Sequence, residues 1–284
     1  MNSNTIFISA LITNINNNIH KNVESYIDYG KKMLNLNISQ ITFIEKKIFY
    51  EYFKEYSNEI SNFFEYSPKL VLEYIILNNK IFVFFEKEDI YLYQFKNNIT
   101  NFVLDTDNIN KDTIEYMFVQ CHKSEWVKMA INLFKSLTLL GIRNLDLDLD
   151  YLHFLWIDFG IYHMIKDDLI FNNEITNLAN RYSSNCIQEN KIRIASCWNM
   201  DLCLPNNYDI YKKIVWYFAG SIFGGTHKEL IAFADKMKDK CIQIISEKKT
   251  IMWEVNIWYL VYLENKTLFE NYLCNHNSSI IINY

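Results

Sequence analysis

Residues 151–164 read YLHFLWIDFGIYHM, and this stretch decides how the rest of the chain is arranged. Residues 152–157 are aromatic or branched and contain no glycine or proline, which predicts a buried central strand of a parallel or mixed sheet. Asp158 follows at the carboxyl end of that strand, where ligands bind in open α/β sheets and where a carboxylate can hold a divalent cation. The alternative is an aspartate that caps the next turn. Gly160 permits a sharp turn or the close approach of a ligand to the backbone.

The composition favours one domain built on a large core. The chain has 284 residues, half of them hydrophobic, with six glycines, two prolines and no linker rich in Gly, Ser or Pro. A net charge of -5 without a basic block argues against nucleic acid as a partner. No signal peptide is predicted, because no cationic region precedes the first apolar run, which Thr13 and Asn14 interrupt. No transmembrane segment is predicted, because no run of 18 apolar residues occurs.

The cysteines indicate a reducing compartment. They form no CxxC pair and lie partly within apolar runs, so we interpret them as buried free thiols of a cytoplasmic protein. The six are Cys121, Cys186, Cys197, Cys203, Cys241 and Cys274.

The chain begins with a β-α-β pattern. Residues 5–13 and 38–44 predict two buried strands, and between them apolar residues at helical spacing predict a helix interrupted at Gly30. A right-handed crossover of this kind places the end of the first strand, at Thr13 and Asn14, at the ligand crevice of an α/β sheet. The unit is common to most α/β proteins and is weak evidence of function by itself.

Further elements follow from the same patterns. We predict a charged, aromatic helix at 46–66 and two short strands at 80–85 and 90–95. Apolar residues at helical spacing from 114 to 137 predict a long helical region with a break near Lys123. After the central strand we predict a helix at 172–181 and a strand at 191–197.

Two local patterns resemble binding sites. Asp146, Asp148 and Asp150 alternate, but they precede the central strand and therefore lie at its amino end, away from the crevice. Gly224 and Gly225 fall where residues 214–226 predict a strand, a tight turn and a helix N-capped by Thr226, and paired glycines there permit close approach to a phosphate or sugar. The spacing matches neither GxGxxG nor a P-loop.

An acid and an amide lie in an otherwise apolar segment near the end of the chain. Glu254 and Asn256 stand between Trp253 and Trp258. A carboxylate among tryptophans is costly to bury without a partner, so Glu254 either is hydrogen-bonded structurally or faces a polar site. The last residues, 275–284, are expected to fold back onto the body of the protein.

Six segments together resemble one known family. TIFISALITNI, KSEWVKMAIN, FLWIDFGIYH, WYFAGSIFGGT, TIMWEVNIW and YLCNHNSSIIINY occur in the order typical of the HtrL/YibB family, also called WlaTC. The resemblance extends from Thr5 to Tyr284. It implies an α/β fold: a single GT-A-like domain with a mixed, mostly parallel central sheet flanked by helices, with a nucleotide-binding half at about 1–160 and a sugar and acceptor half at about 161–284.

The resemblance also implies an activity. The expected enzyme is a hexosyltransferase that moves a sugar from a nucleotide-diphosphate donor, such as a UDP-sugar, to a glycan hydroxyl with the help of Mn²⁺ or Mg²⁺. The alternative is a noncatalytic nucleotide-sugar or glycan binding module. The expected location is the cytoplasm, or the host cytoplasm or virion for a viral protein.

Site residues follow from the same motifs. The resemblance implies Asp158 and His276 as metal ligands, and Glu254 and Asn256 as catalytic residues. The residues that it implies for donor binding are Thr13, Asn14, Lys123, His163, Gly224 and Gly225. Two departures stand out. The Asp-x-Asp of GT-A enzymes is reduced here to Asp158 followed by Gly160, and no arginine precedes Arg143, so Lys21 or Lys123 would supply the charge for a diphosphate.

Overall fold

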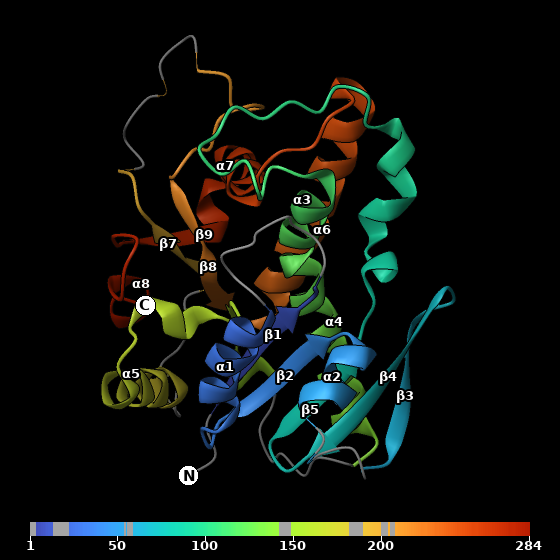
Figure 1. Cartoon of the computed structure of the whole chain (residues 1–284). Coiled ribbons are helices and arrows are strands. Elements are labelled where there is room, and N and C mark those ends of the chain that lie inside the picture. The colour runs from blue at the N-terminus through green and yellow to red at the C-terminus, as the bar shows by residue number, and fades with distance from the viewer. Residues whose placement is uncertain are drawn as a thin grey trace.

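The computed structural model describes residues 4–13, 23–53, 55, 59–141, 149–181, 190–199, 204 and 208–284. Within them a single nine-stranded sheet runs in the order β3-β4-β5-β2-β1-β6-β8-β7-β9 (Figure 1). The strands are β1 (Thr5–Leu11), β2 (Ser39–Ile44), β3 (Ser61–Ser67), β4 (Leu70–Leu77), β5 (Lys80–Phe84), β6 (His153–Ile157), β7 (Ile192–Ser196), β8 (Phe218–Gly225) and β9 (Phe269–Leu273).

The sheet is evenly mixed, which corrects the expectation of a mostly parallel one. The pairs β1-β2, β1-β6, β2-β5 and β7-β9 are parallel, whereas β3-β4, β4-β5, β6-β8 and β7-β8 are antiparallel. The parallel part at β5-β2-β1-β6 holds the predicted crevice. Antiparallel strands extend it on both sides, and β6 joins the two predicted halves because it pairs with β1 and with β8.

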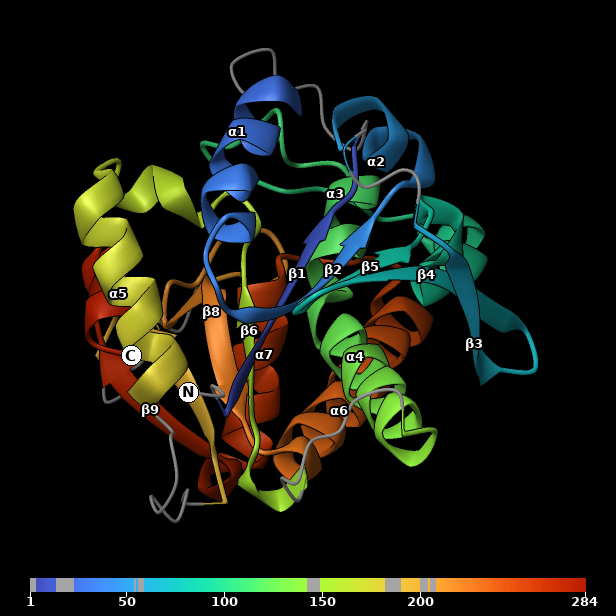
Figure 2. The same cartoon turned by 90° about the horizontal axis from the view of Figure 1, so that it is seen from below.

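Helices cover both faces of the sheet (Figure 2). Their bounds are α1 (Val23–Leu34), α2 (Lys46–Tyr52), α3 (Ile114–Cys121), α4 (Lys123–Leu139), α5 (Asp168–Arg181), α6 (His227–Lys248), α7 (Glu254–Glu264) and α8 (Ser279–Ile282). Strand residues alternate between the two resulting cores: Ile6 and Ile8 face α4, α6 and α7, whereas Phe7 faces α1, α5 and α8.

The predicted central strand is confirmed. β6 lies between β1 and β8 with all five of its residues buried, and Trp156 stacks on Trp126 of α4 with ring centroids 5.8 Å apart. Its aromatic and branched residues are buried on both faces, which explains why the segment carries an unbroken apolar run rather than an alternating pattern.

Several sequence predictions were wrong. Residues 46–66 are not one helix, because α2 ends at Tyr52 and the later residues form β3, an edge strand paired with β4. Residues 90–95 do not form a strand, because a 3₁₀-helix (Tyr91–Asn98) begins directly after Ile90. Helix α1 continues through Gly30 because the glycine makes room for the ring of Phe159, which a side chain at that position would strike.

Other predictions are confirmed. The break before Lys123 lies at His122, between α3 and α4. Thr226 precedes α6 as its N-cap residue, although its hydroxyl bonds to Glu229 rather than to a backbone N–H. The chain end folds back: Tyr284 is fully buried, and its hydroxyl lies 2.8 Å from Nε2 of His153.

Candidate active site

The carboxyl ends of β1 and β6 meet at one edge of the sheet because the two strands are parallel. Asp158 directly follows β6, and Thr13 lies two residues beyond β1. Two helices begin at the same edge: α4 with Lys123 and α7 with Glu254. Four separate segments therefore bring polar side chains to one place.

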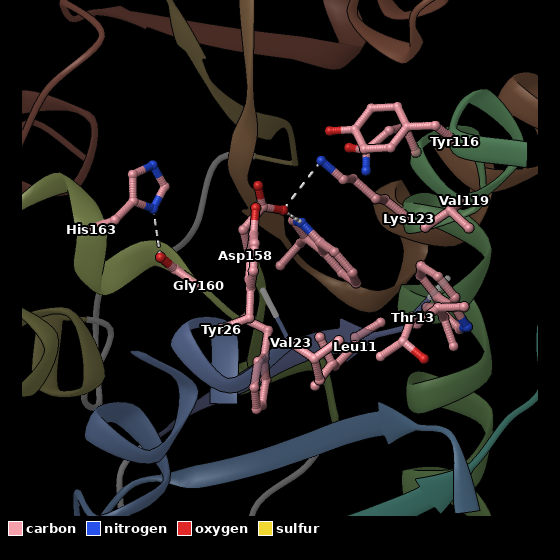
Figure 3. Close-up of a pocket in the computed structure, with 16 residues that line it drawn as sticks. Leu11, Thr13, Val23, Tyr26, Tyr116, Val119, Lys123, Asp158, Gly160 and His163 are labelled. Atoms are coloured by element: carbon pink, nitrogen blue, oxygen red, sulfur yellow. Dashed lines mark hydrogen bonds and ion pairs between the residues drawn. The ribbon is translucent and has the colours of Figure 1, made fainter. Parts of the chain in front are cut away.

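Lys123 is the centre of this cluster, and Figure 3 shows its ammonium group pointing at the carboxylate of Asp158. Its side chain is only 5% exposed, and its Nζ lies 3.2 Å from Oδ1 of Asp158 and 3.1 Å from Oε1 of Glu254. Nζ also donates to the carbonyl oxygen of Gly220 at 2.9 Å. A buried ammonium group with three oxygen acceptors has all of its protons satisfied, so it is held rigidly between the two carboxylates.

The cluster keeps Lys123 charged. Burial would lower the pKa of Lys123, but the charges of Asp158 and Glu254 and their hydrogen bonds outweigh burial and raise it. One ammonium faces two carboxylates, so the three side chains carry a net charge of about -1. The second oxygen of Glu254, Oε2, is buried and has no hydrogen-bond partner among the described residues. Such an oxygen is costly unless a ligand or water pairs with it.

Asp158 is oriented by a second donor. The indole Nε1 of Trp156, two residues earlier on β6, donates to Oδ1 of Asp158 at 3.0 Å. The Asp158 side chain remains 35% exposed. Its carboxylate therefore faces both the buried ammonium and the open space beyond the strand, and it does not cap the following turn.

Gly220 is a site residue that the sequence predictions missed. A Cβ atom there would collide with Oε1 of Glu254 and lie 3.4 Å from Nζ of Lys123. The backbone of β8 must approach the cluster closely at this point, and only glycine leaves room for the carboxylate. The available signal was the scarcity of glycine in the chain, within which Gly220 belongs to the same short cluster as Gly224 and Gly225.

A cavity of about 160 Å³ opens next to this cluster, and an adjoining one of about 140 Å³ contains Glu254. Both are lined by Tyr26, Tyr116, Gln120, Lys123, Asp158 and His163. The first reaches Thr13, whose backbone N–H and hydroxyl both donate to the carboxylate of Glu45. The predicted residues Thr13, Lys123, Asp158, His163 and Glu254 thus share one connected space.

The two predicted histidines line this space differently. His163 is half-buried, and its Nδ1 lies 2.6 Å from the carbonyl oxygen of Gly160. His276 is exposed and packs against Trp216 with ring centroids 5.9 Å apart. His276 shares the Glu254 cavity with Asp158.

Among the described residues no group of three His, Cys, Asp or Glu side chains could hold a metal ion. Oδ1 of Asp158 accepts from the indole of Trp156 and pairs with the ammonium group of Lys123. Metal dependence stays a prediction.

The predicted glycine pair lies elsewhere. Gly224 and Gly225 are strand residues of β8, paired with Leu155 and Phe154 of β6. Phe154 is four residues before Asp158, about 13 Å along the strand. A Cβ at Gly224 would collide with the hydroxyl of Tyr284 and lie 2.7 Å from the carbonyl oxygen of Phe154, so this glycine is needed for packing inside the protein. Its predicted contact with a donor sugar stays a prediction.

Asn256 holds a loop in place. Its Oδ1 accepts from the backbone N–H of Val215 at 2.8 Å, and its Nδ2 donates to the carbonyls of Ile210 and Lys213 at 2.7 Å each. These three bonds use both amide N–H donors and one acceptor position of the oxygen, and they tie residues 210–215 to α7, which gives Asn256 a structural role. Its predicted catalytic role stays a prediction. Asn14, the remaining predicted residue, lies outside the described residues.

Comparison with models of known protein families finds no match, and comparison with curated proteins finds none either. No helix in the described part of the chain combines the length and apolar character that a membrane span requires.

Proposed function

We propose that the protein is a glycosyltransferase that moves a hexose from a nucleotide-diphosphate sugar, such as a UDP-sugar, to a hydroxyl group of a glycan. The observation that carries the proposal is the buried Lys123–Asp158–Glu254 cluster in a cavity at the carboxyl ends of β1 and β6. Open α/β sheets bind ligands at this edge. The resemblance to the HtrL/YibB family, which rests on the segments that supply these three residues, supports the same assignment.

The proposed chemistry uses the chain's own charged groups. Nζ of Lys123 lies beside the cavity, where its charge offsets one of the two carboxylates that a departing diphosphate would otherwise meet. Oε2 of Glu254 has no partner among the described residues, so a hydroxyl group of the acceptor or of the donor sugar can donate to it. The carboxylate of Asp158 pairs with the ammonium group of Lys123 and so helps to hold it beside Glu254. A divalent cation would add positive charge to a cluster whose own net charge is about -1.

The test is release of nucleotide from a donor panel. UDP-glucose, UDP-galactose, UDP-N-acetylglucosamine and GDP-mannose are each incubated with the full chain in Mn²⁺, in Mg²⁺ and in EDTA, and free nucleotide diphosphate is measured. Donor binding is followed separately as a rise in melting temperature, because a ligand that binds the native state stabilises it. At least one UDP-sugar is expected to bind and to be turned over.

A matched pair of variants on helix α7 assigns the role of the acid. Glu254→Gln is expected to lower turnover by roughly a hundredfold while donor affinity stays within a few-fold. Glu264→Gln is the control, because Glu264 lies at the other end of the same helix with its side chain 58% exposed and paired only to Lys240 at 2.7 Å. Equal turnover in both variants and the parent would remove Glu254 from the reaction.

The second candidate is a noncatalytic nucleotide-sugar or glycan binding module. It is favoured by the ion pair itself, since the ammonium that would meet a diphosphate is already neutralised by two carboxylates. The donor panel separates the two functions: a binding module raises its melting temperature with a donor but releases no nucleotide under any of the three metal conditions.

A further inference from the structure

A third cavity, of about 490 Å³, adjoins the Glu254 cavity, and we call it the aromatic cavity. It is lined by three indole side chains, Trp198, Trp216 and Trp253, together with Cys197, Lys111 and His276. Trp198 and Trp216 are partly exposed, whereas Trp253 is a buried member of the main core that also borders this cavity. The other three of the protein's six tryptophans, Trp126, Trp156 and Trp258, do not line it.

Hydrogen bonds hold the Trp253 indole and the backbones of Trp198 and Trp216 in place. Trp253 donates from Nε1 to Oδ1 of Asp112 at 3.1 Å and meets the ring of Tyr116 edge-on, with centroids 5.6 Å apart. The backbone N–H of Trp198 donates to the carbonyl oxygen of Trp216 at 2.9 Å, so the two segments run side by side. Rigid aromatic side chains lose little conformational entropy on binding, which makes them effective contact surfaces for a ligand.

The aromatic cavity opens onto the candidate active site. Lys111, Trp216, Trp253 and His276 line both the aromatic cavity and the cavity that contains Asp158, Lys123 and Glu254. Trp253 also directly precedes Glu254 in the chain. A molecule stacked on these indoles therefore lies next to the buried carboxylate.

We propose that the aromatic cavity binds one pyranose ring of the acceptor glycan, stacked on the indole of Trp216. The face of a gluco- or galacto-configured β-pyranoside that carries axial C–H groups is apolar and flat enough to cover an indole ring, while its hydroxyl groups point outwards. The cavity matches this pattern, since aromatic rings form its walls and Lys111, His276 and two asparagines supply polar groups at its border. Identifying this sugar as the acceptor rests on the proposed transferase function. Stacking of a sugar on Trp216 can be tested without any reaction.

The binding test uses the full chain without donor or metal. The probes are methyl β-D-glucopyranoside, methyl β-D-galactopyranoside, cellobiose and lactose, and saturation-transfer NMR shows which ring protons touch the protein. At least one probe is expected to bind, with the strongest transfer to the axial protons of one face. Trp216→Ala is expected to weaken its binding by about tenfold or more, which corresponds to about 1.4 kcal/mol. Trp216→Phe is expected to retain part of it.

The control variant is Tyr151→Ala. Tyr151 is an aromatic residue with 66% exposure that precedes the amino end of β6, at the opposite end of that strand from Asp158. Its removal should leave sugar binding unchanged. Circular dichroism and a thermal melt establish that each variant is folded, and Trp216→Phe decides the question if Trp216→Ala does not fold.

A second readout uses the parent chain alone. Cys197 lines the aromatic cavity, and its Sγ lies 3.9 Å from that of Cys274. The hydrogen bond between these two free thiols lowers the pKa of Cys197. Alkylation of Cys197 by iodoacetamide, followed by mass spectrometry, is expected to slow when a bound sugar covers the cavity. Two results would overturn the proposal. One is that none of the four probes gives saturation transfer and none slows the alkylation. The other is that every probe that binds the parent binds Trp216→Phe and Trp216→Ala as tightly as it binds the parent.

The outcome is separable from that of the proposed function. Sugar binding that depends on Trp216 without nucleotide release from any donor rejects the transferase and keeps the glycan site. Nucleotide release with sugar binding that ignores Trp216 rejects the glycan site and keeps the transferase. If both hold, Trp216→Ala should raise the KM for the acceptor and leave donor hydrolysis without acceptor unchanged.

Discussion

Replacement of Lys123 by methionine tests whether the buried cluster is organised around this ammonium group. The Lys123 and Glu254 side chains are each 5% exposed, and their charged atoms are 3.1 Å apart. At an effective dielectric constant of about 20, Coulomb's law gives roughly 5 kcal/mol for such a pair. Measured losses on removing one partner of a buried ion pair are about 3–5 kcal/mol, because the remaining charge stays buried without compensation. We expect Lys123→Met to lose stability in this range.

The same helix provides a matched control. Lys128 of α4 pairs with Asp235, but both side chains are more exposed, at 22% and 52%. Lys128→Met should therefore cost less than about 1 kcal/mol, the usual limit for surface ion pairs. Urea denaturation followed by circular dichroism gives the free energy of unfolding of each variant.

A double variant isolates the pair. Lys123→Met combined with Glu254→Gln leaves no unpaired charge between the two positions, so it should recover stability relative to Lys123→Met, with a coupling energy above about 2 kcal/mol. A loss no larger than that of Lys128→Met, or strictly additive effects in the double variant, would refute the reasoning.

Three further changes test separate parts of the fold and site. Burial, assisted by the charge of Lys238, lowers the pKa of His122 to about 3, so between pH 6.5 and 3 the unfolded chain binds a proton that the folded chain does not, and stability falls as the pH falls. His122→Phe should abolish about 3 kcal/mol of the loss between pH 7 and pH 4, and an unchanged pH slope in urea denaturation would contradict this. Gly220→Ala should displace the Glu254 carboxylate and lower nucleotide release more than it lowers the melting temperature, whereas normal turnover would show that the carboxylate can move freely. Gly224→Ala should cost about 1–3 kcal/mol through overpacking against the strand β6 but leave turnover per folded molecule unchanged, and a selective loss of turnover would return this glycine to the site.

Local sequence was sufficient for the buried strands. β5 and β6 each contain a short apolar or aromatic run, and β1, β2 and β7 are rich in branched residues, a composition that burial on both faces of a sheet favours. The edge strand β3 was mistaken for part of a helix because only its pairing with β4 decides its conformation. Neither of its faces is fully buried, so its composition carries little signal.

The individual site residues were also visible in the sequence. Asp158 at the end of an apolar run and Glu254 among tryptophans are exceptions to the hydrophobic pattern around them, and such exceptions indicate a polar partner or a ligand. The sequence does not show which residue is the partner of either carboxylate. Lys123 and Glu254 are 131 residues apart, and the sequence around Lys123 indicates only a lysine near a helix break.

The tertiary structure alone decided which of these residues belong together. The antiparallel pairing of β8 with β6 places Gly220 beside the cluster and moves Gly224 and Gly225 to the far end of the strand, although all three glycines occur within six residues of sequence. The sequence determined the apolar strands and the isolated polar residues because burial constrains each position by itself. The assembly of Lys123 between two carboxylates depended on strand order and register, which are properties of pairs of segments distant in the chain.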